Sequence, residues 1–214
     1  MQCPVCEHPK CDAFQTIGDR SYLRCVVCLA TFLDPELRPG PDAELAEYQL
    51  HQNSDGDANY RQFLRKLSEP LLKRLPPSSQ GLDYGCGPGP TLATLLRESG
   101  HTVALYDPFF HPDRSVLTAT YGFITCSEVI EHFHQPAVEF RRLDAMLAPG
   151  GWLALMTNFQ TDDVRFAGWH YRRDPTHVVF YREATLRWLA QHHGWACEIP
   201  CANVALMQKP RPRP

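Results

Sequence analysis

The sequence lacks long apolar runs, an excess of basic charge and an export segment. No stretch approaches the roughly 20 apolar residues that a membrane-spanning helix needs, so no membrane partner is expected. The formal net charge of −3 gives no overall basic surface for nucleic acid, and no DNA partner is expected. The N-terminus, Met1-Gln2-Cys3-Pro4, is unlike a secretory signal, which predicts a cytoplasmic protein.

Internal repeats are also absent, whereas cysteine is plentiful. The 214 residues, 43% of them apolar, suit one α/β domain with a small additional module. Nine cysteines in a chain without an export signal indicate reduced thiols or metal ligands rather than disulfides.

Four of these cysteines form two C-x2-C pairs near the N-terminus. Cys3 and Cys6 make the first pair, and Cys25 and Cys28 make the second after 18 intervening residues. Two such pairs offer four thiolates for a closed, tetrahedral and structural Zn2+ site, a spacing typical of zinc ribbons. The alternative is four unrelated free cysteines. We predict a zinc ribbon over residues 1–33, followed by a polar linker over 34–59 that is rich in proline and acidic residues.

A glycine-rich loop in Leu82-Asp83-Tyr84-Gly85-Cys86-Gly87-Pro88-Gly89 marks the main domain. Glycines at alternate positions let the backbone turn out of a strand and approach a ligand, with a helix N-terminus behind them. A second strand ends in Asp107, 18 residues beyond Gly89, where a carboxylate can accept hydrogen bonds from ribose hydroxyls. Dinucleotide enzymes share such features, although they more usually have G-x-G-x-x-G. A tight structural turn followed by a surface Asp is the other alternative.

From residue 81 onward, strand and helix patterns alternate, which predicts a mostly parallel sheet covered by helices on both faces. An amphipathic helix precedes them, with Tyr60, Phe63 and Leu64 at its start, and it could cover the cofactor. The proline-rich tail, residues 210–214, is predicted to be disordered.

Over residues 60–209, the chain resembles class I S-adenosylmethionine-dependent methyltransferases, and within them the branch of ubiquinone-pathway O-methyltransferases. The glycine loop, Asp107, Glu128-Val129-Ile130-Glu131-His132 and Leu147-Ala148-Pro149-Gly150-Gly151-Trp152 carry this resemblance in the family's order. It implies a Rossmann-like α/β sheet of seven strands, the last antiparallel. Only Pro108–Gly122 separates Asp107 from the fourth strand, which is short for a helix and a third strand; 115–118 could be a remnant strand. The resemblance also implies that S-adenosyl-L-methionine binds at Asp83, Gly85, Cys86, Gly87, Gly89, Asp107, Pro108, Ser127 and Glu128.

The segment 128–132 carries the sharpest catalytic hypothesis. If it is helical, Glu128, Glu131 and His132 lie on one face at i, i+3 and i+4. Carboxylates with an imidazole suit Mg2+ or another divalent ion. The resemblance makes this pattern a metal site, with His177 or His170 as a further ligand. Otherwise Glu131 and His132 only hydrogen-bond the start of the next helix.

An aromatic insertion follows the fifth predicted strand and is the expected substrate wall. Trp169, Tyr171, Arg172 and Tyr181 could contact substrate there, while His132, His177 and His170 are candidate general bases. The alternative is that the rings only cover the edge of the sheet.

Three functional hypotheses follow. The first is O-methylation of a small hydroxylated molecule, assisted by a metal ion that lowers the pKa of the attacking hydroxyl. The second is an RNA methyltransferase that grips RNA through the ribbon and through a basic patch comprising Arg141, Arg142, Arg172, Arg173 and Lys209. The third is a non-enzymatic protein that binds S-adenosylmethionine or a partner.

Overall fold

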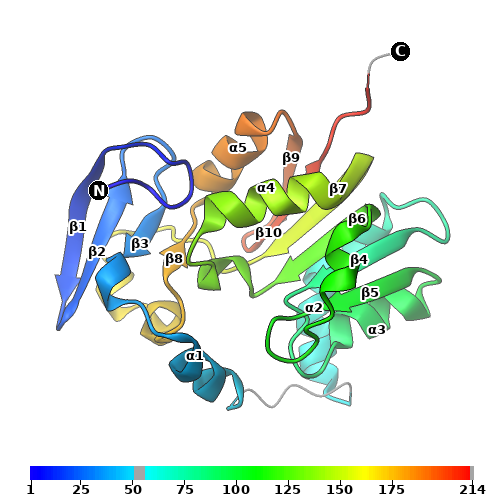
Figure 1. Cartoon of the computed structure of the whole chain (residues 1–214), viewed down its shortest axis with the longest axis horizontal. Coiled ribbons are helices and arrows are strands. Elements are labelled where there is room, and N and C mark those ends of the chain that lie inside the picture. The colour runs from blue at the N-terminus through cyan, green and yellow to red at the C-terminus, as the bar shows by residue number, and fades with distance from the viewer. Residues whose placement is uncertain (51–55, 213–214) are drawn as a thin grey trace.

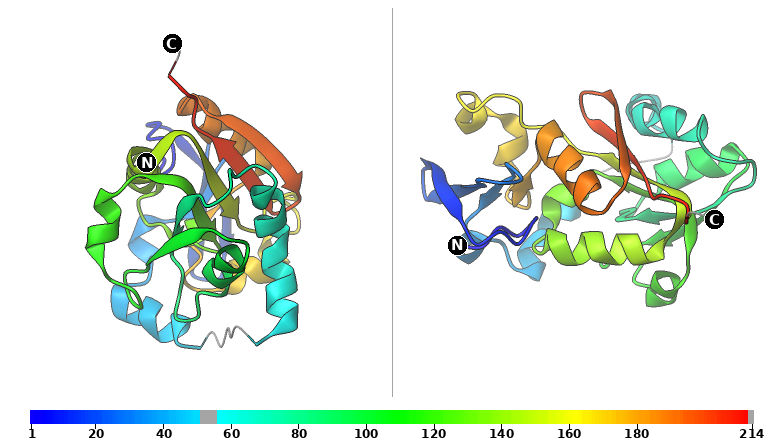
Figure 2. Two further views of the ribbon diagram at one scale, coloured as in Figure 1. Left: turned by 90° about the vertical axis from the view of Figure 1, so that its right-hand side faces the viewer. Right: turned by 90° about the horizontal axis from the view of Figure 1, so that it is seen from above.

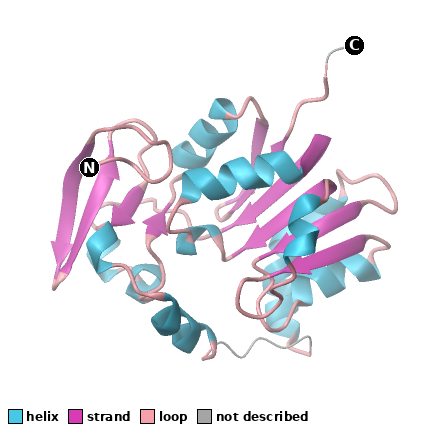
Figure 3. Cartoon of the chain, in the orientation of Figure 1, coloured by secondary structure: helices cyan, strands magenta, loops and turns pink. Residues whose placement is uncertain are grey.

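The chain folds into two β-sheets that lie beside each other (Figures 1 and 3). The computed structural model describes residues 1–50 and 56–212. Within those ranges, no helix is both long enough and apolar enough to cross a bilayer. Residues 51–55 within the predicted linker and residues 213–214 at the end of the predicted tail lie outside the described residues.

The smaller sheet belongs to the N-terminal module but contains one strand from much later in the chain. Its strands pair antiparallel throughout. In sheet order they are β1 (Cys11–Ile17), β2 (Arg20–Cys25), β3 (Thr31–Leu33) and β8 (Val179–Phe180). Because β8 comes from the predicted insertion, backbone hydrogen bonds tie the module to the rest of the molecule.

The central sheet has six strands among the described residues rather than the seven expected. The first four strands in sheet order are parallel, and β10 is antiparallel to both of its neighbours, as expected. The order is β5 (Thr102–Tyr106), β4 (Gln80–Tyr84), β6 (Tyr121–Ser127), β7 (Leu147–Met156), β10 (Val204–Gln208) and β9 (Ala196–Cys201).

The strand that the resemblance implies between β5 and β6 is absent from the described residues, which accounts for six strands instead of seven. A crossover alone needs a dozen residues or more, so the segment between Asp107 and the start of β6 at Tyr121 is too short for a crossover, a third strand and a return connection. It forms the 3-10 helix η2 (Arg114–Thr118), so the predicted remnant strand over 115–118 is wrong.

Helices cover both faces of the central sheet (Figure 2). Leu64, Leu67 and Leu71 of α2 recur every three or four residues and are fully buried against α3 and one sheet face. Each burial contributes about 2 kcal/mol. The opposite face packs against α4 and α5. The helices are α1 (Pro41–Tyr48), α2 (Ala58–Leu72), α3 (Thr91–Glu98), α4 (Pro136–Met146) and α5 (Glu183–His192).

The N-terminal module shares its apolar core with the face that α4 and α5 cover. Tyr22 and Phe32 of the module belong to the same buried cluster as Phe166 and Phe180. The region expected to be a linker also contains structure, because 34–59 holds the 3-10 helix η1 (Pro35–Leu37), helix α1 and the start of α2. The remaining 3-10 helices are η3 (Ile130–His132), η4 (Phe166–Gly168) and η5 (His170–Arg173).

Candidate active site

A cavity of about 760 Å³ opens at the carboxyl ends of β4, β5 and β6. In open α/β sheets, ligands bind outside these strand ends. Side chains from α1 and α2 also line it, including Tyr48, Tyr60 and Leu64. The expectation that the helix beginning near Tyr60 covers the cofactor region agrees with this lining.

The glycine loop forms one wall of the cavity and needs glycine at two positions. Gly85 has a φ of 78° and its amide donates to Tyr106 O at 2.7 Å. A Cβ atom there would lie 2.5 Å from Val129. Gly87 has a φ of 65°, and a Cβ atom there would meet nothing within 4 Å. The backbone at Gly87 therefore borders open space, where a ligand can approach it closely.

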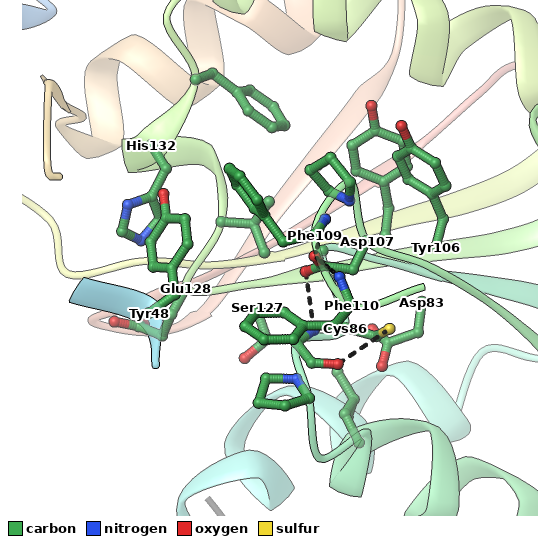
Figure 4. Close-up of a pocket in the computed structure, with 18 of the residues that line it drawn as sticks. Tyr48, Asp83, Cys86, Tyr106, Asp107, Phe109, Phe110, Ser127, Glu128 and His132 are labelled. Carbon is green, nitrogen blue, oxygen red and sulfur yellow. Dashed lines mark hydrogen bonds between the residues drawn. The ribbon is translucent and has the colours of Figure 1, made fainter. Parts of the chain in front are cut away.

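Asp107 organises this wall through its carboxylate. Its Oδ2 accepts from the Gly87 amide at 3.1 Å. Its Oδ1 accepts from the amides of Phe109 at 2.9 Å and Phe110 at 3.0 Å. The carboxylate thus links the glycine loop to the loop after β5 (Figure 4).

Asp83 lies deeper beneath the same loop. It is 3% exposed and accepts from Thr125 Oγ1 at 2.7 Å. Burial raises the pKa of Asp83 to about 6, against the lowering effect of the Thr125 hydrogen bond.

All nine residues predicted to bind the cofactor line this one cavity. Two of them offer buried polar atoms without a partner among the described residues, Ser127 Oγ and Glu128 Oε1. Unsatisfied buried groups are costly, which favours a ligand that completes their hydrogen bonds. The nine are Asp83, Gly85, Cys86, Gly87, Gly89, Asp107, Pro108, Ser127 and Glu128.

The predicted helical alignment of Glu128 with Glu131 and His132 is wrong. Glu128 has a φ of 54° and Val129 a φ of −134°, so only Ile130–His132 is helical, as η3. Glu128 is therefore turned out of the ligand cluster that its sequence spacing suggested. Burial raises its pKa to about 7.

Glu131, His132 and His177 do come together. One potential ligand atom from each lies within 4.8 Å of the others. The Val178 amide donates to Glu131 O at 2.9 Å, which brings the two segments into register. The imidazole rings of His132 and His177 lie 4.7 Å apart and edge to face. Tertiary folding, rather than helical spacing, assembles this histidine–glutamate cluster.

Each imidazole of the histidine–glutamate cluster is oriented by a backbone carbonyl. His132 Nδ1 lies 3.1 Å from Thr176 O, and His177 Nδ1 lies 2.6 Å from Tyr171 O. An Nδ1–H bound to a carbonyl leaves Nε2 as the acceptor or ligand atom, an arrangement typical of metal-ligating and general-base histidines.

Glu131 is the buried member of the cluster. It is fully buried, accepts from the Tyr171 hydroxyl at Oε1, and has no hydrogen-bond partner at Oε2 among the described residues. Burial, reinforced by the nearby Glu128, raises its pKa to about 7. A cation beside Oε2 would relieve both the missing partner and the repulsion.

Comparison with known protein families decides what this cavity belongs to. A family model described as a methyltransferase domain matches residues 57–198. The chain belongs to this methyltransferase family. Among curated proteins, none matches the sequence.

Solved structures show the same fold at low identity. An N1-methyltransferase of 1,6-didemethyltoxoflavin from Burkholderia thailandensis, with its substrate and S-adenosylhomocysteine bound, is similar with a TM-score of 0.53 and 18% identity. That match covers 93% of this chain and 99% of the other. The magnesium protoporphyrin IX methyltransferase of Synechocystis PCC 6803, with bound S-adenosylhomocysteine, gives a TM-score of 0.53 at 13% identity over 78% of this chain and 94% of the other. The protein is thus a class I S-adenosylmethionine-dependent methyltransferase, which sets aside the non-enzymatic alternative.

The insertion of this methyltransferase contributes Asp174 and His177 to the cavity, but not the four side chains expected to contact substrate. None of Trp169, Tyr171, Arg172 and Tyr181 lines the cavity. They pack behind it instead. Tyr181 is fully buried and donates to Ile130 O at 3.0 Å, and Arg172 donates to the Tyr22 hydroxyl at 3.2 Å. The strand β8 pulls this segment into the smaller sheet, so its rings join the two parts of the molecule.

His170 also lies away from the cavity. It borders a separate shallow hollow with Trp169 and Arg173. Sequence reasoning instead missed Glu44, Tyr48 and Asp174, which line the main cavity. Asp174 could have been found from its position three residues before His177. Nothing in the sequence of residues 41–48 indicates that the helix turns toward the cofactor loop.

The four N-terminal cysteines form a second cluster, and none of them lines the cavity. Their Sγ atoms lie within 4.8 Å of one another, with Cys3 and Cys28 at 3.6 Å and Cys6 and Cys25 at 3.3 Å. Tetrahedral Zn2+ with Zn–S distances of roughly 2.3 Å needs sulfur atoms about 3.8 Å apart. The Val27 amide also donates to Cys25 Sγ. The donor set fits a structural zinc ion.

Proposed function

We propose that this methyltransferase transfers a methyl group to the hydroxyl of a small molecule. The observation that carries the proposal is the position of His132 and His177. Both line the same cavity as the glycine loop and Asp107. A proton acceptor beside the cofactor site is what methylation of a weakly acidic hydroxyl requires.

The chain's own residues would hold the cofactor. The loop from Gly85 to Gly89 would cradle its methionine part, and Asp107 would accept hydrogen bonds from its ribose. When bound, S-adenosylmethionine supplies a methyl group on a cationic sulfonium that is reactive without further activation. The protein therefore has to align the acceptor and remove its proton.

The Nε2 atom of His132 or His177 is the proposed proton acceptor. The hydroxyl O–H bond breaks as its oxygen bonds to the methyl carbon, and the proton passes to Nε2. The backbone carbonyls at Nδ1 stabilise the resulting imidazolium. Asp174 Oδ2, 3.7 Å from His177 Nε2, adds to that stabilisation.

In the alternative that we also propose, the cluster of Glu131, His132 and His177 holds a divalent ion, and the Nε2 atoms that ligate the ion do not accept the proton. Two imidazoles with one carboxylate suit Mn2+ or Zn2+ better than Mg2+, which prefers oxygen ligands alone. Such an ion would lower the pKa of an acceptor hydroxyl. Glu128 is not part of this proposed ligand set, because its backbone turns away.

The charges around the cavity argue against the RNA alternative. Six acidic side chains line it beside a single arginine, Arg142, and that arginine pairs with Glu139 at 2.7 Å. A polyanion would be repelled. Three of the five residues of the basic patch are also paired with acids, since Arg141 pairs with Glu7, Arg142 with Glu139 and Lys209 with Asp144. The six acids are Glu44, Asp83, Asp107, Glu128, Glu139 and Asp174.

We also propose that residues 1–33 are a zinc ribbon whose ion is structural. The four thiols would saturate the ion, which leaves no coordination position for substrate. A module of this size has little core of its own, so the ion would supply much of its folding free energy.

The test of the function uses cell extract separated into small molecules and RNA. The enzyme is incubated with each fraction and with S-adenosylmethionine carrying a tritiated methyl group. We expect label in the small-molecule fraction as a base-stable methyl ether, identified by mass spectrometry. Label on RNA, or on nitrogen or carbon alone, would overturn O-methylation of a small molecule.

A further inference from the structure

Helix α1 reaches the cavity although it lies outside the matched methyltransferase domain. The matched region begins at residue 57, whereas Glu44 and Tyr48 of α1 line the cavity. These residues are four positions apart and therefore lie on one face of the helix. The chain runs from the smaller sheet through α1 before it enters α2 (Figure 1).

Core packing does not explain why this face turns inward. No residue of α1 is fully buried. A helix that packs for stability normally buries an apolar stripe. Here the inward positions are a carboxylate and a tyrosine, and both border the cavity. Glu44 and Tyr48 therefore shape the cavity instead of stabilising an apolar core.

Tyr48 faces the proposed reaction centre (Figure 4). Its ring lies 5.3 Å from the His132 ring and 5.5 Å from the Phe109 ring. Burial raises the pKa of the Tyr48 hydroxyl, which keeps it protonated. The cofactor loop lies on the opposite side of the cavity, with Asp83, Cys86 and Asp107. A planar molecule between these two sides would have Tyr48 on one flank.

Contacts with His134 of the methyltransferase domain hold α1 in this place. Arg38, just before the helix, donates to His134 O at 2.6 Å. Glu44 Oε1 lies 2.8 Å from His134 Nε2. The module itself is fixed by the β3–β8 pairing and by ion pairs from Arg24 and Arg182 to Asp163. Helix α1 and the N-terminal module are therefore both attached to the methyltransferase domain.

We propose that α1 selects the methyl acceptor, with Tyr48 stacking on an aromatic ring of the acceptor and Glu44 binding a cationic or hydrogen-bond-donating substituent. This inference rests on the proposed function. The acceptor class is a neutral or cationic hydroxylated aromatic molecule, because the acidic lining disfavours anions.

The test compares three catechols with the same reacting hydroxyls: one with an aminoethyl group, one with a methyl group and one with a carboxylate. Methyl transfer to each is measured with the holoenzyme. Wild type should prefer the amine over the carboxylate by at least about tenfold, equivalent to 1.4 kcal/mol. Glu44→Gln should reduce that ratio several-fold, because Glu44 is the acid proposed to bind the amine, while the other acids that line the cavity remain. Tyr48→Ala should raise the KM of every catechol by about tenfold with a smaller change in kcat, and Tyr48→Phe should restore KM.

Control variants distinguish a role of α1 in acceptor selection from a general effect of the substitutions on the structure. Glu47→Gln alters a charge on the same helix at a position that does not line the cavity, and it should leave the ratio unchanged. S-adenosylhomocysteine affinity, measured by calorimetry, should be equal in all variants. If wild type methylates the catechols but Glu44→Gln and Tyr48→Ala keep its ratio and KM, α1 does not select the acceptor and the proposed function stands. If wild type methylates none of the three, the proposed acceptor class fails and the inference falls with it.

Discussion

The cysteine cluster and the histidine–glutamate cluster are both candidate metal sites, yet their surroundings differ. The four cysteines lie on two short turns of one small module and have an apolar environment. Glu131, His132 and His177 come from two distant segments, and the two histidines border an open cavity. The first cluster is closed, as a structural site is, and the second keeps a side toward a ligand. The number and access of the ligands therefore assign different roles to the two sites.

The two regions also differ in what they contribute to stability. The cysteine cluster would gain free energy by binding its ion. The cavity contains buried acids with raised pKa values and polar atoms without partners. Such groups destabilise the folded state, and functional sites commonly have them.

The largest expected effect is the loss of the cysteine cluster. Cys25→Ser should abolish tight zinc binding and unfold the module, at a cost on the order of 5 kcal/mol or more. Elemental analysis and thermal unfolding measure both. Cys197→Ser is the matched control, because Cys197 is half-buried and lies outside the cluster. A full equivalent of zinc in Cys25→Ser would remove the structural assignment.

The second prediction compares the metal affinity of the histidine–glutamate cluster with that of the cysteine cluster. Mild chelation should lower turnover by at least about 100-fold while zinc remains in the ribbon, because one carboxylate and two imidazoles bind more weakly than four thiolates. Added Mn2+ should restore activity, and Glu131→Gln should mimic chelation without weakening cofactor binding. Glu36→Gln, at an exposed acid, is the control. Turnover that is indifferent to chelator would leave His132 and His177 as bases without metal.

The third prediction concerns the cost of a buried acid. The pKa of Asp83 is about 6 in the folded protein against an ordinary value of 3.8. Above pH 3.8 the unfolded chain loses this proton first, so the Asp83 contribution to stability falls as pH rises toward 6 and stays low above it. Asp83→Asn should therefore gain stability over wild type between pH 5 and 7, by at most on the order of 3 kcal/mol.

Denaturant unfolding at several pH values, with the cofactor absent, measures this difference. Asp113→Asn is the control, because Asp113 is exposed. A stability difference between Asp83→Asn and wild type that does not change from pH 5 to pH 7 would contradict the raised pKa.

The smallest expected effect is on cofactor affinity. Asp107→Ala should weaken S-adenosylhomocysteine binding by about 2 kcal/mol, or roughly 30-fold, since hydrogen bonds to a charged group contribute about 1.5–3 kcal/mol. The loop amides that Asp107 holds would lose their acceptor as well. Calorimetry provides the measurement, with Asp113→Ala as control. Wild-type affinity in Asp107→Ala would rule out a ribose contact.

Local patterns determined the elements and the cofactor loop. Helix α5 (Glu183–His192) illustrates this, since its apolar spacing and the glycine that follows it, Gly194, lie within one segment. The glycines of the loop follow equally local rules, because a positive φ is a property of single residues. All nine cofactor residues that the resemblance implied line one cavity, because the parallel strands β4, β5 and β6 end at the same edge of the sheet.

Contacts between distant segments were decided only by the tertiary structure. No periodicity reveals that Val179–Phe180 joins the smaller sheet, and that pairing moved Trp169, Tyr171, Arg172 and Tyr181 away from the cavity. The positive φ of Glu128 replaced a helical alignment with a cluster that includes His177. Helix α1 entered the cavity wall through Arg38 and Glu44, whose partner is His134. The sequence by itself determined which chemical groups the protein has, because motifs and backbone preferences are local. Which of them meet depended on packing and strand pairing, whose free energies arise between residues far apart in the chain.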